Sequence, residues 1–217
     1  MIEQIHPDTT AVTTQAILQH LYHEAGTLVR ISEEEFAFTR FANRTFPAEL
    51  VNSLIDQGWL LKIKPTYRTP NRKEFYSISN AGIKAIGGVE LFGTAEIASE
   101  LRMRPWEIDE LTTLHKKLNP IGRIIGRDWR IYGRYSIKEY LGCLEDGDTN
   151  PELKLLKVSA VAKVTGQSIH TVQKHILQRL LYGKSLSGKV MVFTKTQVAN
   201  YIVWLQTRAS YRQRVRL

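Results

Sequence analysis

The chain has 217 residues, of which 43% are hydrophobic and 24% charged, and it carries a net charge of +9 at neutral pH. This composition predicts folded cores and excludes a largely disordered chain. No apolar run reaches the ~18 residues of a membrane span, and the first ten residues lack the basic and apolar segments of a secretory signal. The single cysteine, Cys143, excludes an internal disulfide framework and a cysteine-rich zinc site. We therefore expect a cytoplasmic protein.

The positive charge is concentrated in the last third of the chain. Residues 1–86 have no net charge and residues 87–150 have a net charge of −2, whereas residues 151–217 have +11 and a single acidic residue, Glu152. Lysine and arginine release condensed counterions from phosphates, so this pattern favours binding to nucleic acid. A merely solubilising basic surface is the alternative. An anionic membrane is a weaker one, because no basic amphipathic helix with a bulky apolar face is evident.

Two polar breaks divide the chain into three pieces. They fall at Gly87-Gly88 and at residues 145–151, where turn-forming residues interrupt the apolar periodicity. The expected domains are residues 1–86, 89–144 and 152–207, followed by a basic tail at 208–217. Each piece has the length of a minimal winged-helix fold.

The first piece alternates helical and strand-like patterns. The expected elements are a helix around residues 16–22, a strand at 28–31, a helix beginning at Ser32 in a capping box, a helix at 46–59, and strands at 60–64 and 74–78 joined by a basic turn. Residues 76–82, YSISNAG, resemble the sequence that leaves the wing in bacterial winged-helix regulators. The resemblance covers most of residues 12–86 and implies a winged helix there.

The second piece contains a helix-turn-helix pattern. A first helix is expected at residues 94–101, a turn at 102–104, and a second helix from Pro105 to Leu114 that buries Ile108. A hairpin turning near residues 126–128 and a short helix at 136–141 follow. The residues that resemble the wing and closing helix of the excisionase and MerR-like family are Gly126, Arg127, Trp129, Arg130, Ile131, Tyr140 and Leu141. This resemblance covers residues 91–142.

The third piece repeats the second at an offset of 64 residues. Residues Ile97-Ala98 fall on Val161-Ala162, and Ile108 falls on Val172. The turn at residues 165–168 contains a glycine, a helix is expected at 169–180, and a hairpin and a closing helix to about residue 206 follow. Residues 155–206 thus look like a degenerate copy of the excisionase-like unit. The fold class that this predicts is mainly α with small β-hairpin wings (α+β), in three tandem winged-helix or helix-turn-helix domains.

These resemblances imply a DNA-binding surface. In a helix-turn-helix the second helix enters the major groove, and hairpin wings contact the flanking backbone. The residues expected to contact DNA are His170, Thr171, Gln173, Lys174 and Gln178 on the third unit's helix; Lys184, Lys189, Arg104, Arg123, Arg127 and Arg130 on turns and wings; Asn52, Arg68, Arg72 and Lys73 in the first unit; and Arg212 and Arg214 in the tail. A solvated polar surface is the alternative for the helix.

The second unit's equivalent helix has the opposite character. Its outward residues are Trp106, Glu107, Asp109 and Glu110, and carboxylates are repelled by phosphates. Two interpretations remain open for this unit: DNA contacts through its basic wing alone, or a protein-binding role for the helix.

The sequence indicates no catalytic site and no metal site. It has no glycine-rich phosphate loop, no nucleophile in a recognised setting, and six scattered histidines that predict no metal site. We expect a protein that is not an enzyme and has no cofactor. It should bind double-stranded DNA in a sequence-specific manner, most simply as a transcriptional regulator associated with the nucleoid. The alternative is a DNA-binding adaptor or architectural factor of a plasmid, phage or transposon, in which the first or second domain binds protein or a second copy.

Overall fold

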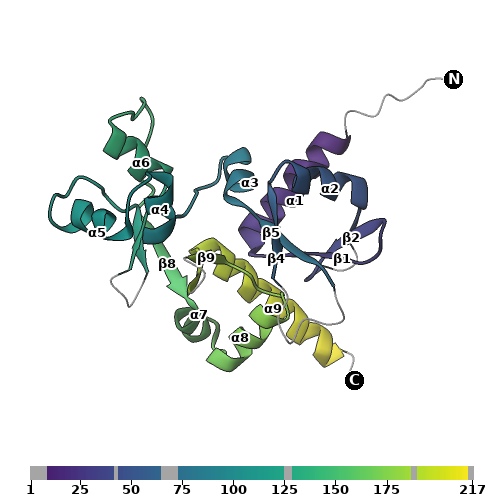
Figure 1. Cartoon of the computed structure of the whole chain (residues 1–217). Helices are drawn as coiled ribbons and strands as arrows, with labels where there is room; N and C mark the ends of the chain where they lie inside the picture. Colours follow the sequence, from purple (N-terminus) through teal and green to yellow (C-terminus); the bar gives the residue numbers. More distant parts are fainter. Residues whose placement is uncertain (1–8, 42–43, 65–72, 125–128, 187–189, 215–217) are drawn as a thin grey trace. The chain divides into compact units, whose positions relative to one another are not determined.

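The computed structural model describes residues 9–41, 44–64, 73–124, 129–186 and 190–214, with side chains described from residue 14 to residue 208 of these ranges. The chain divides into two compact units, residues 1–88 with 175–182 and residues 89–174 with 183–217. The described residues form an α+β fold with two five-stranded sheets (Figure 1). The prediction of a mainly α chain of three tandem winged-helix domains is therefore wrong.

Unit 1 is an antiparallel sheet packed against two helices. Its elements are α1 (Thr9–Glu24), β1 (Leu28–Arg30), β2 (Glu35–Phe38), β3 (Thr45–Pro47), α2 (Ala48–Asp56), β4 (Leu60–Ile63), β5 (Phe75–Ile78) and α3 (Asn80–Ala85). The strand order is β3-β2-β1-β5-β4. Leu21 of α1, Phe36 of β2 and Leu54 of α2 are buried together in its core.

One predicted helix of unit 1 is a strand. The capping-box pattern at Ser32 led us to expect a helix there, but β2 pairs with β1, with Leu28 opposite Phe38 and Arg30 opposite Phe36. Phe36, Ala37 and Phe38 are all buried. Burial of this apolar segment in the sheet outweighs the local helical preference of the preceding glutamates.

The YSISNAG segment has a structural explanation. Ser79 caps α3, because its hydroxyl accepts a hydrogen bond from the Gly82 amide at 3.0 Å and donates one to the Gly58 carbonyl at 2.6 Å. A side chain at Gly82 would place its Cβ 2.4 Å from the carbonyl oxygen of Trp59. The glycine is needed for this close approach of two backbone segments.

Residues 175–182 complete unit 1. The buried hydroxyl of Thr27 donates to the Arg179 carbonyl at 2.9 Å, and the amide of Tyr182 donates to the Ala25 carbonyl at 2.7 Å. The Arg179 guanidinium donates to the Lys64 carbonyl at 2.7 Å. This late segment therefore satisfies backbone groups of a unit that was expected to end at residue 86.

Unit 2 is built around a mixed sheet of order β7-β6-β8-β10-β9. Its elements are α4 (Thr94–Glu100), α5 (Pro105–Thr113), β6 (Gly122–Ile124), β7 (Arg130–Ile131), α6 (Arg134–Leu141), β8 (Leu153–Lys157), α7 (Val158–Thr165), the start of α8 (Ile169–Leu177), β9 (Lys184–Leu186), β10 (Val190–Phe193) and α9 (Lys195–Arg214). Figure 1 shows β8 leading from the region of α4 directly into α7.

The two hairpins of unit 2 belong to one sheet because β8 lies between them. β8 pairs in parallel with β6, with Gly122 opposite Leu153, and antiparallel with β10, with Phe193 opposite Leu156. Ile124, Leu155 and Leu186 from the two halves are buried in one core. The second and third pieces are thus not independent winged helices.

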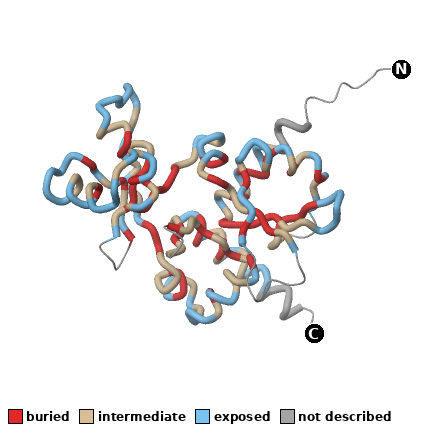
Figure 2. The backbone as a smooth tube through the Cα atoms, in the orientation of Figure 1, coloured by how far each residue is buried: buried red, intermediate tan, exposed pale blue. Residues whose placement is uncertain are grey.

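Helix α9 is longer than expected. The closing helix was expected to end near Gln206, whereas it continues to Arg214 and includes most of the basic tail. The buried side chains of its first half include Val198 and Tyr201. In Figure 2 the buried positions follow the strands and the inner sides of the helices, while much of α8 is intermediate or exposed.

Candidate nucleic-acid interface

The predicted repeat is present in the backbone of the two helix pairs α4–α5 and α7–α8. Adding 64 to the bounds of α5 (Pro105–Thr113) gives the bounds of α8 (Ile169–Leu177), and α4 and α7 begin at equivalent positions. The turns correspond as well: the amide of Met103 donates to the Ala98 carbonyl at 2.8 Å, and that of Gln167 donates to Ala162 at 3.0 Å. The two helix pairs therefore share one local geometry.

Each turn has one residue in the left-handed conformation. It is Gly166 in the second pair, with φ of 66°, and Arg102 in the first, with φ of 55°. Glycine adopts this conformation without steric cost, whereas arginine does not. The position ends the first helix and allows the chain to start the second in a new direction.

Different side chains cap the N-terminus of the second helix in the two pairs. Glu107 reaches back to accept from the Arg104 amide at 2.5 Å, and the Ser168 hydroxyl accepts from the Thr171 amide at 3.0 Å. Both caps satisfy an amide that a helix N-terminus otherwise leaves unpaired. Ile108 and Val172 then occupy the same buried inward position in the two helices.

The outward side chains of α7 and α8 form the candidate interface, which we call the α7–α8 face. It consists of Lys163, His170, Thr171, Gln173 and Lys174, whereas the predicted contact Gln178 follows the end of α8 and belongs to the segment assigned to unit 1. All are exposed except Thr171, which is half-buried and hydrogen-bonded to Ser168 through its hydroxyl at 2.9 Å. Because the chain has no acidic residue after Glu152, no carboxylate of residues 153–217 opposes an approaching phosphate.

The equivalent surface on the first helix pair we call the α5 face. It consists of Trp106, Glu107, Asp109, Glu110 and Leu114. Asp109 and Glu110 are exposed at the positions that Gln173 and Lys174 occupy on α8. Trp106 and Leu114 are exposed too, at 52% and 71%. The α5 face is therefore acidic and partly apolar where the α7–α8 face is polar and cationic.

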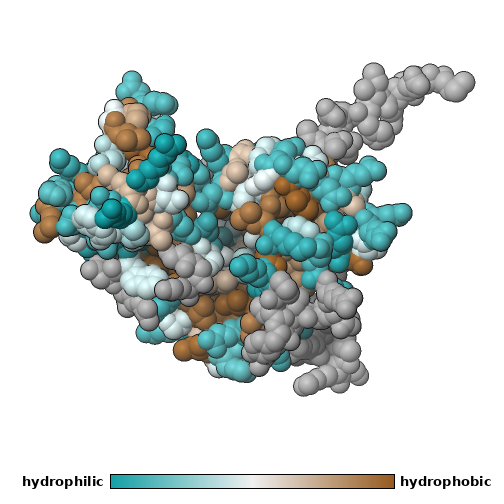
Figure 3. Space-filling model, viewed as in Figure 1, coloured by the Kyte–Doolittle hydropathy of each residue, from teal (hydrophilic) through white to brown (hydrophobic). Residues whose placement is uncertain are grey.

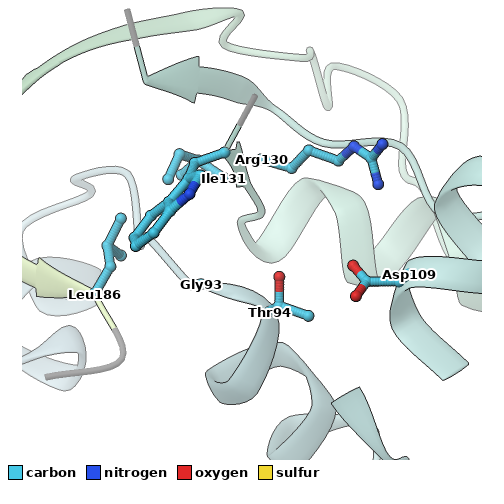
Figure 4. Close-up of a pocket in the computed structure, with 7 residues that line it drawn as sticks. Gly93, Thr94, Asp109, Arg130, Ile131 and Leu186 are labelled. Carbon is cyan, nitrogen blue, oxygen red and sulfur yellow. The ribbon is translucent and has the colours of Figure 1, made fainter. Parts of the chain in front are cut away.

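The predicted wing residues of the first pair lie in different environments. Arg104 and Arg123 are exposed, whereas Arg130 is half-buried. Arg130 lines a cavity of about 280 Å³ with Gly93, Thr94, Asp109, Trp129, Ile131 and Leu186. In Figure 4, Arg130 and Asp109 lie at one end of this cavity and Leu186 at the other. Arg134, the next cation along this hairpin, forms ion pairs with Glu90 at 3.1 Å and Glu100 at 2.7 Å.

Lys184 is a predicted contact that the structure places close to carboxylates. It is half-buried on β9, and this burial lowers the pKa of its ammonium group, while the nearby carboxylates Glu96 and Glu90 act in the opposite direction. A cation held near two carboxylates is partly neutralised before any phosphate arrives. Lys184 therefore differs from Lys174, which is exposed.

The remaining predicted contacts are spread over the chain. Asn52 is half-buried in α2 and its side-chain oxygen accepts from the Arg30 guanidinium at 3.1 Å, while Lys73 is exposed. Arg212 and Arg214 lie in the last turns of α9, where the structure describes only the backbone. The predicted contacts that lie outside the described residues are Arg68, Arg72, Arg127 and Lys189.

Several exposed cations were not predicted. Lys163 lies on α7, and Lys154 and Lys195 line a second cavity of about 410 Å³ with Thr194 and neighbouring residues of β8 and α9. From the sequence, the region of α7 was interpreted only through its packing positions, and no element was expected at β8, which follows the predicted linker at residues 145–151. The absence of acidic residues from position 153 onward was the signal that could have extended the candidate surface to these lysines.

The described part of the chain holds no group of three histidine, cysteine, aspartate or glutamate side chains placed as metal ligands. Within the same residues, no helix is both long and apolar enough to cross a membrane. Comparison with known proteins found no matching family, curated protein or solved structure.

Proposed function

We propose that this chain binds double-stranded DNA through the α7–α8 face, as a sequence-specific factor and most simply a transcriptional regulator. The observation that carries the proposal is an exposed helix surface of hydrogen-bonding and cationic side chains in a segment without a carboxylate. Such a surface suits a duplex because cations gain free energy by displacing counterions from phosphates. A merely solvated surface usually mixes both signs of charge.

The residue types on α8 match the groups on base edges. A glutamine such as Gln173 bonds in a bidentate manner to adenine, and a lysine such as Lys174 bonds to guanine or a phosphate. These side chains, with His170, lie in the first two turns of α8. Helices that insert into the major groove usually contact bases through their N-terminal turns.

A DNA-binding adaptor or architectural factor of a mobile element is the second candidate. It is supported by the α5 face, whose exposed Asp109 and Glu110 disfavour contact with phosphates and whose exposed Trp106 suits a protein partner. In this case the α7–α8 face holds DNA while the α5 face recruits another molecule.

A salt series of binding to random-sequence duplex, followed by selection of preferred sites, tests the leading proposal. The variants are Gln173→Ala/Lys174→Ala and, as the matched control, Asp109→Ala/Glu110→Ala at the equivalent repeat positions. We expect the first to lose the selected motif, to bind about tenfold more weakly, and to lower the slope of log affinity against log salt by about 1. The control should bind as well as the wild type or better.

Equal binding by the two double variants would contradict the use of α8. Tight binding without any selected motif would favour the architectural role. Absence of binding at low salt would reject both candidates, because both require contact with duplex DNA.

A further inference from the structure

Unit 2 carries two exposed surfaces of opposite chemistry on one compact body. The α5 face presents the carboxylates of Asp109 and Glu110 between two exposed apolar side chains, Trp106 and Leu114. Arg104 precedes the helix and Lys116 follows it, so the negative charge of Glu107, Asp109 and Glu110 lies between two cations along the chain. Hydrophobic atoms reach the surface both over α5 and beside α7 (Figure 3).

The α7–α8 face is complementary to the α5 face in charge, and exposed apolar side chains lie beside it. Lys163 and Lys174 are exposed cations, and Val164 and Ile169 beside them are exposed at 57% and 49%. Opposite charges steer association, while apolar contacts such as those of a tryptophan provide most of the affinity of a typical interface. Since both faces occur once in each copy, one chain carries both halves of a possible contact.

We propose that the α5 face of one copy docks on the α7–α8 face of a second copy, with Asp109 and Glu110 opposite Lys163 and Lys174 and with Trp106 packed near Val164 and Ile169. The contact joins two different surfaces, so it leaves an unused face at each end and allows further copies to add. Exposed ion pairs of this kind weaken as salt rises.

The association competes with DNA, because Lys174 belongs to both contacts. The acidic α5 face would then occupy the cationic surface when no DNA is present, and duplex would release it. The competition rests on the proposed function, whereas the association between copies does not. The two can therefore fail separately in experiment.

Sedimentation velocity of the full chain over a dilution series, at low and at high salt, tests the proposal. The wild type should associate at low salt and dissociate at high salt. Trp106→Ala should weaken association through loss of the apolar contact. Glu110→Lys and Lys174→Glu should each weaken it by about fivefold or more, because each places like charges opposite one another. Circular dichroism spectra and melting curves identify any variant that fails to fold.

Mixing the two charge-reversal variants gives the sharpest result. Each alone sets like charges together, but an equimolar mixture of Glu110→Lys and Lys174→Glu chains offers opposite charges in both possible contacts. The mixture should associate as the wild type does, and so should a chain carrying both substitutions. A misfolded variant would not be rescued in this way.

A wild type that stays monomeric at low salt would overturn the proposal and leave the α5 face for a different cationic partner. Association unchanged by Trp106→Ala and Glu110→Lys would overturn it as well. If duplex DNA binds but does not reduce the association, the copies contact each other elsewhere. If no duplex binds and the mixture still associates, the proposed function fails and the association stands.

Discussion

Helices α5 and α8 occupy equivalent places 64 residues apart in the chain, and their surfaces are nearly opposite in charge. The inward position is apolar and buried in both, as Ile108 and as Val172. Two outward positions differ completely: Asp109 and Glu110 on α5 correspond to Gln173 and Lys174 on α8. Packing constrains the first kind of position and solvent does not constrain the second, so a repeated scaffold can carry two different binding surfaces.

A substitution in the shared sheet should have the largest effect on stability, because this sheet supports both helix pairs. At Gly122 an added Cβ would lie 2.1 Å from the Leu153 carbonyl oxygen, in the parallel pairing of β6 with β8. Gly122→Ala should lower the free energy of unfolding by about 4 kcal/mol, since a backbone segment must move. Chemical denaturation measures the change. Arg123→Ala, at the exposed neighbouring residue, is the control and should change the free energy of unfolding by less than about 0.5 kcal/mol. Similar losses for both variants would contradict the close pairing of β6 with β8.

Truncation of the equivalent buried residues tests whether the two pairs are equally well packed. Ile108→Ala should lower the free energy of unfolding by about 3 kcal/mol, because it removes three buried carbon atoms and leaves a cavity. Val172→Ala removes one carbon atom fewer, so it should lower the free energy of unfolding by less, about 2 kcal/mol. Thermal unfolding with matched denaturant titrations would detect the difference. A Val172→Ala cost near zero would show that α8 is loosely held and would weaken its role as a rigid binding helix.

The smallest expected effect concerns the turn between the helices. Arg102→Gly should raise stability by about 0.5 kcal/mol, because relief of the left-handed strain of about 1 kcal/mol is partly offset by the greater freedom of glycine in the unfolded chain. Gly166→Ala should lower stability by about 0.5 kcal/mol, because alanine gains the left-handed strain and only part of that cost is offset by its smaller freedom in the unfolded chain. Differential scanning calorimetry can resolve both shifts. Shifts of the same sign would mean that the two turns are not equivalent.

The sequence predicted local elements well where apolar periodicity and turn residues agreed. Helix α5 begins at the expected Pro105 and ends one residue before the expected Leu114. The 64-residue repeat was also predicted, since Ile97 and Val161 are both fully buried in equivalent helices. These features depend on residues close together in sequence.

Strand β8 was missed because its evidence is not local. Leu153-Lys-Leu-Leu-Lys is short and follows a polar segment that is typical of a linker. Its place in the centre of a sheet is decided by partners far away in the chain, β6 in parallel and β10 in antiparallel pairing. Without that strand the two hairpins looked like wings of separate domains, and so the fold class was wrong.

The candidate site was predictable in part. Exposure of His170, Gln173 and Lys174 follows from the helical pattern around buried Val172. The burial of Lys184 near Glu90 and Glu96 was not predictable, because it depends on how β9 packs in the shared sheet. Whether any of these residues contacts DNA stays a prediction.

The parallel pairing of β6 with β8 also bears on how unit 2 unfolds. Separate tandem domains would melt in separate steps, but strands from both repeats here share a ladder of hydrogen bonds and a core. We expect hydrogen exchange to give the amides of β6, β8 and β10 one common free energy of opening, as in a single cooperative unit. Cutting the chain within residues 145–151 would then leave two halves with open strand edges prone to aggregate, instead of two working modules.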